Sequence, residues 1–523
     1  MSRKIPVPYN PFIPAYLAKH TVFLPADGRT MATFVCSTKG SGKSRYIGRV
    51  HIPQDILSRT PLVAITPVTG LIENVLDKCC YLPDPVFAEC WSRIHYINMA
   101  GQPADHSGDR LIIPFPIYQR TNPTESFYDI TKPFVDVIRR VDPALSAASI
   151  QGMNRLLPIL LSSGIIIAAL GLGIREAYSL VSDPKEWEPR IIEVAAAYPT
   201  YIDVQEAAAD LLDLAQLQAK QPREFEIRTE VYRNKLAPFR FNPVMAAIFN
   251  GSSDKAISWD EVESKQLAVL IDLKDIDDAE DKRFCYFWIF HSLMRWMKKR
   301  GKHAIPFSLV IDELSECVGS VELNAEIFAS DLDALLNRYA RNNSVQVTLM
   351  AQELHQFQDP KIQHTLLSCG NLILGSTTNK ETALLFARRF FRPDLYKIKE
   401  QLPVYGSDRG DYFELDRRNV YFTPDEQDEL NSRKFLDLPT FQFYLGVSPR
   451  EGTPPTSLQR FSIEALDRGI YPDPERIEAI QHGLMRRDGV RHSEVLPSRP
   501  VSPGHTVGQH PAPKIKHAVK VVG

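Results

Sequence analysis

The sequence lacks any C-x-x-C pair, although it contains seven cysteines. An odd set without such pairs gives no sign of a disulfide framework. Several of the cysteines lie in apolar runs, where a thiol behaves as a small hydrophobic side chain. We therefore expect reduced cysteines and a cytoplasmic location.

An excess of charge of either sign is also missing. The 61 Lys and Arg residues nearly balance the 63 Asp and Glu residues, which gives a formal net charge of −2. This balance excludes a surface coated with positive charge. Any contact with nucleic acid must then come from local basic patches or from the inner surface of an oligomer.

An export signal is absent as well, because prolines and polar residues interrupt the chain from its charged start up to Leu24. The uncharged stretch 156–174 is about as long as a membrane span. One proline and three glycines divide it: Pro158, Gly164, Gly171 and Gly173. We therefore favour two buried helices joined near Gly171, with a transmembrane helix as the alternative.

The chain has 523 residues, of which 44% are hydrophobic and 24% charged, so it is long enough for two or three hydrophobic cores. Up to about Phe115, short apolar runs alternate with helical segments, a pattern typical of a parallel α/β sheet. The strands expected there are 32–36, 62–66, 94–97 and 111–113.

From about Asp129 to Ile257 the strand signal disappears and helical patterns replace it. Strand signals return at 267–273, 307–311, 345–350 and 371–375, and a long helix with an acidic start and a basic end follows the first of them. We predict an α/β fold with a mostly parallel sheet, interrupted by an all-α insertion. The expected ranges are 1–128 and 258–453 for the core, 129–257 for the insertion, and 454–523 for a proline-rich C-terminal extension that is largely a disordered tail.

A glycine-rich turn follows the first expected strand: Ser37-Thr38-Lys39-Gly40-Ser41-Gly42-Lys43-Ser44. Gly40 and Gly42 let the turn expose consecutive backbone N–H groups to an anion, and a helix that begins near Lys43 adds the positive end of its dipole. Lys43 would reach the β- and γ-phosphates, and the Ser44 hydroxyl would bind Mg²⁺. The pattern predicts an ATP site formed by Ser37, Thr38, Lys39, Gly40, Ser41, Gly42, Lys43, Ser44 and Arg45.

Ser37 stands where the pattern G-x-x-x-x-G-K-[ST] has glycine, so we expect the start of the loop to be less tightly turned. The alternative is a Gly/Ser-rich loop that contains Gly-Lys-Ser by chance. The strand before the turn and the helix-compatible segment 45–50 after it supply the context that the motif needs.

Another strand, 308–311, runs into Asp312 and Glu313. Asp312 would hold Mg²⁺, mostly through water, and Glu313 would polarise the water that attacks the γ-phosphorus, a general-base role that contributes about 10²–10⁴-fold. The strand 345–350 leads to Gln352, whose neutral amide can bind the γ-phosphate as donor or acceptor. The alternatives are a solvated acidic pair and an ordinary polar residue at a strand end.

The order of these motifs resembles the HerA/FtsK superfamily of DNA-pumping ATPases, and most of all its TraG-like branch, the type IV coupling proteins of conjugation and secretion. The likeness covers roughly residues 21–387. It rests on Lys43-Ser44, a helical insertion, Asn234-Lys235-Leu236, the strand at 267–273, Asp312-Glu313, Arg341, Gln352 and the strand at 371–375. The sequence departs from the pattern at Ser37 and at 67–70, where many relatives carry an Asp-rich turn. It also lacks the N-terminal membrane helices that relatives in secretion often have.

The resemblance implies a RecA-like P-loop NTPase core assembled as a ring of six, with ATP and Mg²⁺ between neighbouring subunits and DNA threaded through the centre. An arginine of the adjacent subunit would complete each site by stabilising charge on the transferring phosphoryl group. The candidates are Arg341, Arg338, Arg388 and Arg389, with Arg341 assigned to the catalytic set. Membrane-associated transfer machinery could be reached through other proteins.

Two basic segments, 295–302 and 388–392, mix aromatic residues with positive charge, a composition that suits DNA contact. The alternative is a solvated face, and the first segment also reads as the end of a helix.

The leading hypothesis is an ATP-driven motor that moves DNA, for example in conjugation or mobile-element transfer. A secretion ATPase acting on protein cargo would share the fold but would be activated by a protein partner rather than by DNA. A nucleotide-gated scaffold with little turnover is the third hypothesis, and the Asp312-Glu313 pair argues against it.

Overall fold

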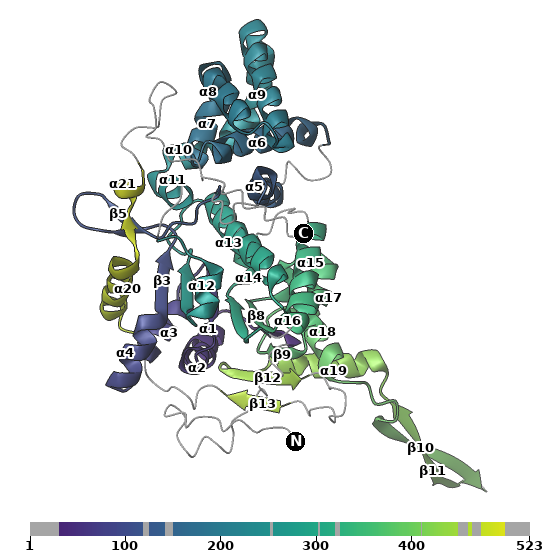
Figure 1. Cartoon of the computed structure of the whole chain (residues 1–523). Helices are drawn as coiled ribbons and strands as arrows, with labels where there is room; N and C mark the ends of the chain where they lie inside the picture. The colour runs from purple at the N-terminus through teal and green to yellow at the C-terminus, as the bar shows by residue number, and fades with distance from the viewer. Residues whose placement is uncertain are drawn as a thin grey trace, which may run out of the picture. The chain divides into compact units, whose positions relative to one another are not determined.

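The computed structural model of the chain describes residues 31–118, 125–141, 150–250, 255–301, 304–318, 325–408, 411–447, 459–462 and 472–496. The chain divides into two compact units, whose helices and strands are labelled in Figure 1. Unit 1 comprises Met1–Gln102, Val137–Ala148 and Ile257–Gly489, and unit 2 comprises Pro103–Asp136, Ser149–Ala256 and Val490–Gly523. Each unit is therefore built from segments that are far apart in the sequence.

Unit 1 contains a nine-stranded sheet with the strand order β13-β12-β9-β1-β8-β7-β2-β6-β3. The strands from β9 to β3 pair in parallel, and β12 and β13 add to the β9 edge in antiparallel orientation. The strands are β1 (Thr33–Cys36), β2 (Leu62–Thr66), β3 (Ile94–Asn98), β6 (Ala268–Asp272), β7 (Phe307–Ile311), β8 (Val345–Ala351), β9 (Asn371–Leu374), β12 (Gln442–Val447) and β13 (Gln459–Ser462). The prediction of an α/β fold with a mostly parallel sheet is confirmed.

The central strands are mostly apolar because a parallel sheet is covered on both faces. Every residue of β1, β2, β6, β7 and β8 is buried. Parallel pairing also places the carboxyl ends of these strands at one edge of the sheet, which is where open α/β sheets bind ligands.

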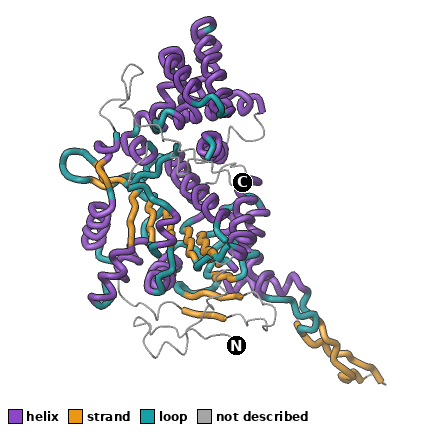
Figure 2. The backbone as a smooth tube through the Cα atoms, viewed as in Figure 1, coloured by secondary structure: helices purple, strands orange, loops and turns teal. Residues whose placement is uncertain are grey.

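Helices connect the strands of unit 1, and Figure 2 shows them in purple around the orange sheet. The helices are α1 (Lys43–Tyr46), the π-helical turn η3 (Ile47–His51), α2 (Ile52–Leu57), α3 (Leu71–Cys79), α4 (Asp84–Arg93), α12 (Trp259–Ser264), α13 (Ala279–Lys299), α14 (Leu314–Val318), α15 (Ala325–Asp333), the π-helical turn η6 (Ala334–Tyr339), α16 (Ala340–Asn342), the short 3₁₀ helix η7 (Leu354–Gln356), α17 (Pro360–Leu367), α18 (Lys380–Phe390), α19 (Pro424–Leu436) and α20 (Pro474–Asp488). Asp278 caps the start of α13 and Lys298 and Lys299 lie in its last turn, as its charge pattern predicted.

An antiparallel hairpin lies between α18 and α19 and was not predicted from the sequence. Its strands, β10 (Ile398–Asp408) and β11 (Asp411–Tyr421), pair only with each other. Figure 1 shows the hairpin extending beyond α19, away from the nine-stranded sheet. Leu402, Val404 and Tyr405 are exposed along it.

Unit 2 is mostly helical. Its helices are α6 (Ile150–Ala169), α7 (Ile174–Ser182), α8 (Pro184–Ala197), α9 (Ile202–Lys220), α10 (Pro222–Phe241), α11 (Pro243–Phe249) and α21 (His492–Val495), and α5 (Phe127–Val141) begins in unit 2 and ends in unit 1. Gly164 lets α6 approach α5 closely, because a Cβ at this position would lie 2.3 Å from Thr131 Cγ2. A separate three-stranded sheet is formed by β14 (Val490–Arg491), β5 (Arg110–Ile112) and β4 (Gln102–Pro103).

The apolar stretch 156–174 forms α6 and the start of α7, with Gly171 in a left-handed conformation (φ 66°) between them. Leu160 and Ile166 of this stretch are fully buried. The prediction of two buried helices joined near Gly171 is confirmed. In the part of the chain that the structure describes, no helix combines the length and apolar character needed to span a membrane.

The expected strand at 111–113 is present as β5, but its assignment to the parallel sheet is wrong. β5 pairs with β14 in antiparallel orientation, in a sheet separate from the nine-stranded one. The apolar run was too short to distinguish the two arrangements, and its partner comes from the C-terminal part of the sequence. The C-terminal range 454–523 also contributes β13 and α20, and residues 497–523 lie outside the described part.

Candidate functional site

The glycine-rich turn after β1 has the conformation that its glycines allow. Gly40 and Gly42 have φ values of 78° and 99°, which only glycine adopts readily. Gly42 caps α1, and its carbonyl accepts the first helical hydrogen bond from Tyr46 N at 2.8 Å. The Ser41 hydroxyl is buried in the turn and has no hydrogen-bond partner among the residues that the structure describes. The turn thus contains a polar group and a helix start arranged to bind an anion.

Lys43 is buried at the first position of α1. Its Nζ donates to the carbonyl oxygen of Ser37 at 2.8 Å, so the side chain folds back across the turn. Its positive charge also lowers the pKa values of Asp312 and Glu313, against the larger effect of their burial. Lys43 is therefore close enough to both carboxylates to interact with them electrostatically.

Asp312 and Glu313 follow β7 at the carboxyl edge of the sheet. Asp312 is completely buried, and its Oδ1 accepts a hydrogen bond from the Glu313 backbone N–H at 3.0 Å. Burial, and next the negative charge of Glu313, raise the pKa of Asp312 to about 7. Burial also raises the pKa of Glu313, whose backbone is in the left-handed region (φ 45°). A strained backbone and two adjacent buried acids are typical of a functional site.

Gln352 comes directly after β8, the neighbour of β7 in the sheet. Its side-chain amide lowers the pKa of Glu313 in part, against the larger effect of burial. The backbone carbonyl oxygen of Gln352 accepts a weak hydrogen bond from Cys36 Sγ at the end of β1 (3.7 Å). The structure thus brings together Lys43, Asp312, Glu313 and Gln352 at the ends of three adjacent strands.

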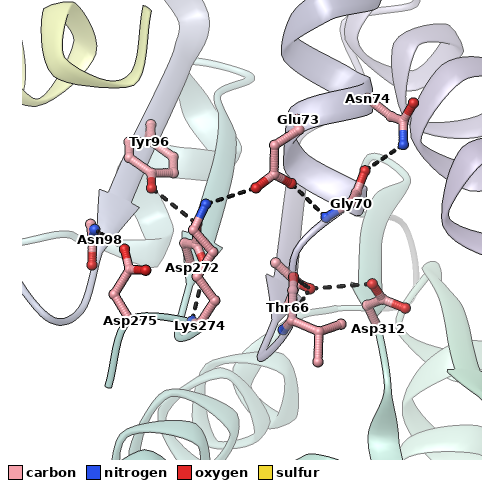
Figure 3. A network of polar contacts seen from close by, with 11 residues as sticks. Thr66, Gly70, Glu73, Asn74, Tyr96, Asn98, Asp272, Lys274, Asp275 and Asp312 are labelled. Carbon is pink, nitrogen blue, oxygen red and sulfur yellow. Dashed lines mark hydrogen bonds and ion pairs between the residues drawn. The ribbon is translucent and has the colours of Figure 1, made fainter. Parts of the chain in front are cut away.

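Oxygen ligands suited to Mg²⁺ are present in the same place. Ser44 is half-buried in the first turn of α1, and a Cβ on Gly70 would lie only 3.9 Å from its Cβ. Gly70 belongs to the loop that starts at Thr66, whose hydroxyl lies 3.2 Å from Asp312 Oδ2 (Figure 3). Mg²⁺ prefers a few carboxylate and hydroxyl oxygens together with phosphate. The Ser44 hydroxyl, the Asp312 carboxylate and the unpartnered Ser41 hydroxyl fit a nucleotide-bound cation.

The other predicted binding residues occupy different positions in the turn. Ser37 is buried and Thr38 half-buried at its start, Lys39 is exposed near its tip, and Arg45 is half-buried in α1.

Thr66 was missed by the sequence analysis. Its hydroxyl also lies 2.8 Å from the Val68 carbonyl oxygen, so Thr66 joins Asp312 to the loop after β2. The available signal was the position of Thr66 at the end of a strand that neighbours β7.

A second buried carboxylate, Asp272, lies at the end of β6. Figure 3 shows it beside Tyr96 and Lys274. The Tyr96 hydroxyl donates to Asp272 Oδ2 at 3.0 Å, and Lys274 Nζ lies 3.2 Å from the same oxygen. Lys274 Nζ also donates to Glu73 Oε1 at 2.7 Å, and Glu73 Oε2 accepts from the Gly70 backbone N–H at 2.7 Å. Burial raises the pKa of Asp272 to about 6.

The candidate arginines are not part of the cluster within this chain. Arg338 and Arg341 are exposed on η6 and α16, and Arg389 is exposed on α18. Arg388 forms an ion pair with Asp428 of α19, with Nε and Oδ2 2.9 Å apart.

The basic segment 295–302 is divided: Trp296, Met297 and Arg300 are buried, whereas Lys298 and Lys299 are exposed. Arg300 is buried, pairs with Glu263 (Nη2 to Oε1, 2.6 Å) and lies 4.9 Å above the Trp296 ring. Trp296 Nε1 donates to Asp260. These contacts favour the helix-end interpretation over DNA contact for Arg300 and Trp296, and Lys302 lies outside the described residues.

The aromatic residues of 388–392 also pack within unit 1. Phe390 stacks on Phe435, and Phe391 contacts Phe435 and Tyr444. These two rings are therefore used in packing rather than presented for base stacking.

No protein-family model matches the sequence, and a comparison with curated proteins finds no match. Solved structures do match the fold. The bacterial conjugative coupling protein TrwBdeltaN70, in its unbound monoclinic form, is 16% identical with a TM-score of 0.52, and the match covers 86% of this chain and 88% of that chain. The plasmid coupling protein TrwB in complex with ADP and Mg²⁺ is 16% identical with a TM-score of 0.52, over 86% of this chain and 89% of that chain.

A third structure is the plasmid coupling protein TrwB in complex with the non-hydrolysable ATP analogue ADPNP. It is 15% identical with a TM-score of 0.52, over 86% of this chain and 88% of that chain. At these identities the likeness establishes the fold. The fold expected from the resemblance to coupling proteins, a RecA-like P-loop core with a helical insertion, is the fold of this chain.

Proposed function

We propose that this protein is an ATP-driven motor that acts on DNA, in the manner of a conjugative coupling protein. The observation that carries the proposal is the convergence of Lys43, Asp312, Glu313 and Gln352 at one edge of the sheet, next to an anion-binding turn. The proposal that the cargo is DNA is supported by the fold, which this chain shares with TrwB, a conjugative coupling protein.

The roles follow from the chemistry of each side chain. The backbone N–H groups of 38–44 would bind the phosphates, and Lys43 would leave the Ser37 carbonyl to contact the β- and γ-phosphates. Ser44 and Asp312 would hold Mg²⁺, which when bound neutralises charge on the phosphate oxygens. Glu313 would accept a proton from the attacking water, and Gln352 would orient Glu313 and contact the γ-phosphate.

The remaining parts of the proposal concern assembly. Six copies would form a ring around DNA. An exposed arginine, for which Arg341 is the first candidate, would complete the site of the neighbouring copy. The protein would act in the cytoplasm and reach membrane-associated transfer machinery through other proteins. Cys36, Cys79, Cys80, Cys90, Cys285 and Cys369 form no disulfide with one another, which agrees with a reducing compartment.

The test is ATP turnover by the full chain with and without single- and double-stranded DNA, with the mass measured by light scattering. We expect DNA to stimulate turnover and ATP to favour a ring. Glu313→Gln should lower turnover by about 10²–10⁴-fold and retain nucleotide binding, because it removes the base but leaves the phosphate contacts.

A matched control is Glu316→Gln, which changes an exposed carboxylate one helical turn after Glu313. Turnover by Glu313→Gln at the wild-type rate would contradict the assignment of the base. Turnover that ignores DNA but responds to a protein partner would favour a secretion ATPase instead.

A further inference from the structure

The start of the phosphate-binding turn is bonded to the loop that follows β9, residues 375–379, which we call the β9–α18 loop. Ser37 Oγ donates to the Ser376 carbonyl oxygen at 3.1 Å, and the Thr38 backbone N–H donates to the same oxygen at 2.9 Å. The Thr38 and Ser376 hydroxyl oxygens lie 3.0 Å apart. Ser37 stands where the motif has glycine, so its side chain makes a contact that glycine could not make.

Gly375 shows how closely the two segments pack. A Cβ at this position would lie 2.2 Å from Ser37 Oγ and 2.7 Å from Ser37 Cβ. Since no side chain fits between them, a shift of the β9–α18 loop must shift the start of the turn as well.

The same loop is held by Glu353, the residue after Gln352. Glu353 is 8% exposed, its Oε2 accepts from Thr377 Oγ1 at 2.5 Å, and its Oε1 accepts from the Thr378 backbone N–H at 3.2 Å. Hydrogen bonds to a carboxylate are roughly twice as strong as those between neutral groups. Glu353 therefore fixes the loop relative to the end of β8, which Gln352 directly follows.

We propose that Glu353 is a positioning residue that, through the β9–α18 loop, couples the start of the phosphate-binding turn to the position of Gln352. This inference rests on the proposed function and deepens it. A triphosphate would contact both the turn and Gln352, so it gains affinity from a fixed distance between them. A diphosphate would contact only the turn and gains less.

The test compares the affinities of ADP and a non-hydrolysable ATP analogue, each with Mg²⁺, for the full chain by calorimetry. Glu353→Gln should weaken binding of the analogue by about tenfold and binding of ADP by less than about threefold, as expected for the loss of one charged hydrogen bond. The control is Glu381→Gln, an exposed carboxylate in the first turn of α18, which should change neither affinity.

The ratio of the two affinities separates coupling from a general structural role. A residue that only stabilises the fold would weaken both nucleotides by the same factor, and an unchanged ratio in Glu353→Gln would overturn the proposal. If the wild-type chain binds neither nucleotide, the proposed function fails together with this inference. If the wild-type chain binds both nucleotides but Glu353→Gln leaves the ratio of their affinities unchanged, only this inference fails and the proposed function stands.

A second variant tests the same coupling at a different contact, so that the conclusion does not depend on Glu353→Gln alone. Ser37→Gly restores the glycine of the motif and removes the hydroxyl contact to Ser376. It should lower the analogue-to-ADP ratio by about threefold, and the double variant should be no worse than Glu353→Gln, because both changes interrupt one path. Additive effects of Ser37→Gly and Glu353→Gln on the affinity ratio would contradict the proposal that both residues act through the β9–α18 loop. If Glu353→Gln does not fold, Thr377→Val, which removes one donor to the same carboxylate, replaces it in the cycle.

Discussion

Two buried carboxylates lie at strand ends in the same sheet, and their surroundings differ. Asp272, at the end of β6, has the Lys274 ammonium and the Tyr96 hydroxyl as partners (Figure 3). Asp312, at the end of β7, has a second acid beside it, and Lys43 donates to the Ser37 carbonyl instead. Burial raises the pKa of Asp272 to about 6 and that of Asp312 to about 7.

We interpret the difference as that between a structural acid, Asp272, and the proposed functional acid, Asp312. Asp272 is neutralised by a cation that belongs to the fold, whereas the Asp312 and Glu313 pair is arranged so that a cation from outside would relieve it. Substitutions around Asp272 should therefore affect stability, and substitutions around Asp312 and Glu313 should affect nucleotide chemistry.

The largest effect is expected for Lys43→Ala. Loss of the buried ammonium should lower ATP turnover by at least about 1000-fold and abolish stabilisation by Mg²⁺–ATP in thermal melts, because the phosphates lose their main cationic contact. Lys185→Ala, which changes an exposed lysine of α8, is the control. Turnover by Lys43→Ala within tenfold of wild type would remove the basis for calling this edge functional.

Next in size is Lys274→Met, which should reduce the free energy of unfolding by about 3–5 kcal/mol because it leaves Asp272 and Glu73 without their cation. Urea unfolding followed by tryptophan fluorescence measures this. Lys265→Met breaks an exposed pair with Glu261 and should cost at most about 1 kcal/mol. The folded Lys274→Met protein should hydrolyse ATP within a few-fold of wild type, and a loss of turnover without a loss of stability would break the comparison.

The pH dependence of stability provides the third comparison. An aspartate in water has a pKa of 3.8, whereas burial raises the pKa of Asp312 in the folded chain to about 7. The folded chain therefore keeps a proton that the unfolded chain has lost, and nucleotide-free protein should lose stability as the pH rises from about 4 to about 7.

Asp312→Asn removes this contribution, so its stability should improve relative to wild type over the same pH range. Denaturant unfolding at several pH values, without nucleotide or Mg²⁺, measures the difference. Parallel curves for the two proteins would show that Asp312 does not titrate in this range.

The smallest effect is expected for Tyr96→Phe. It removes one donor to Asp272 and should cost about 1–2 kcal/mol of unfolding free energy. Because the Lys274 pair remains, ATP turnover should not change. A large fall in turnover would mean that the Asp272 network takes part in nucleotide chemistry.

The sequence predicted those parts of the fold and site that depend on local pattern. Buried strands such as β2 and β7 are short, mostly apolar runs. The rule that parallel strands share a carboxyl edge then predicted that Lys43, Asp312 and Gln352 lie close together. The roles of these residues remain predictions until the variants are measured.

Other features depend on contacts that no local pattern encodes. Glu353 and Ser376 act through a loop contact that exists only in the folded chain, so their spacing in the sequence carries no signal. β5 was assigned to the wrong sheet because its partner, β14, lies near the opposite end of the chain. The aromatic and basic side chains of 295–302 resembled a nucleic-acid surface, but Trp296 and Arg300 are buried in the folded chain, which the composition of the segment does not reveal.

The β10–β11 hairpin has a practical consequence. All of its backbone pairing joins residues that are near one another in the sequence, and α18 and α19 contact each other at its base through the Arg388–Asp428 ion pair. Shortening this arm would leave every strand of the nine-stranded sheet in place. A fluorophore or an affinity handle attached to its exposed residues would therefore label the chain next to α18 and α19 without entering the core.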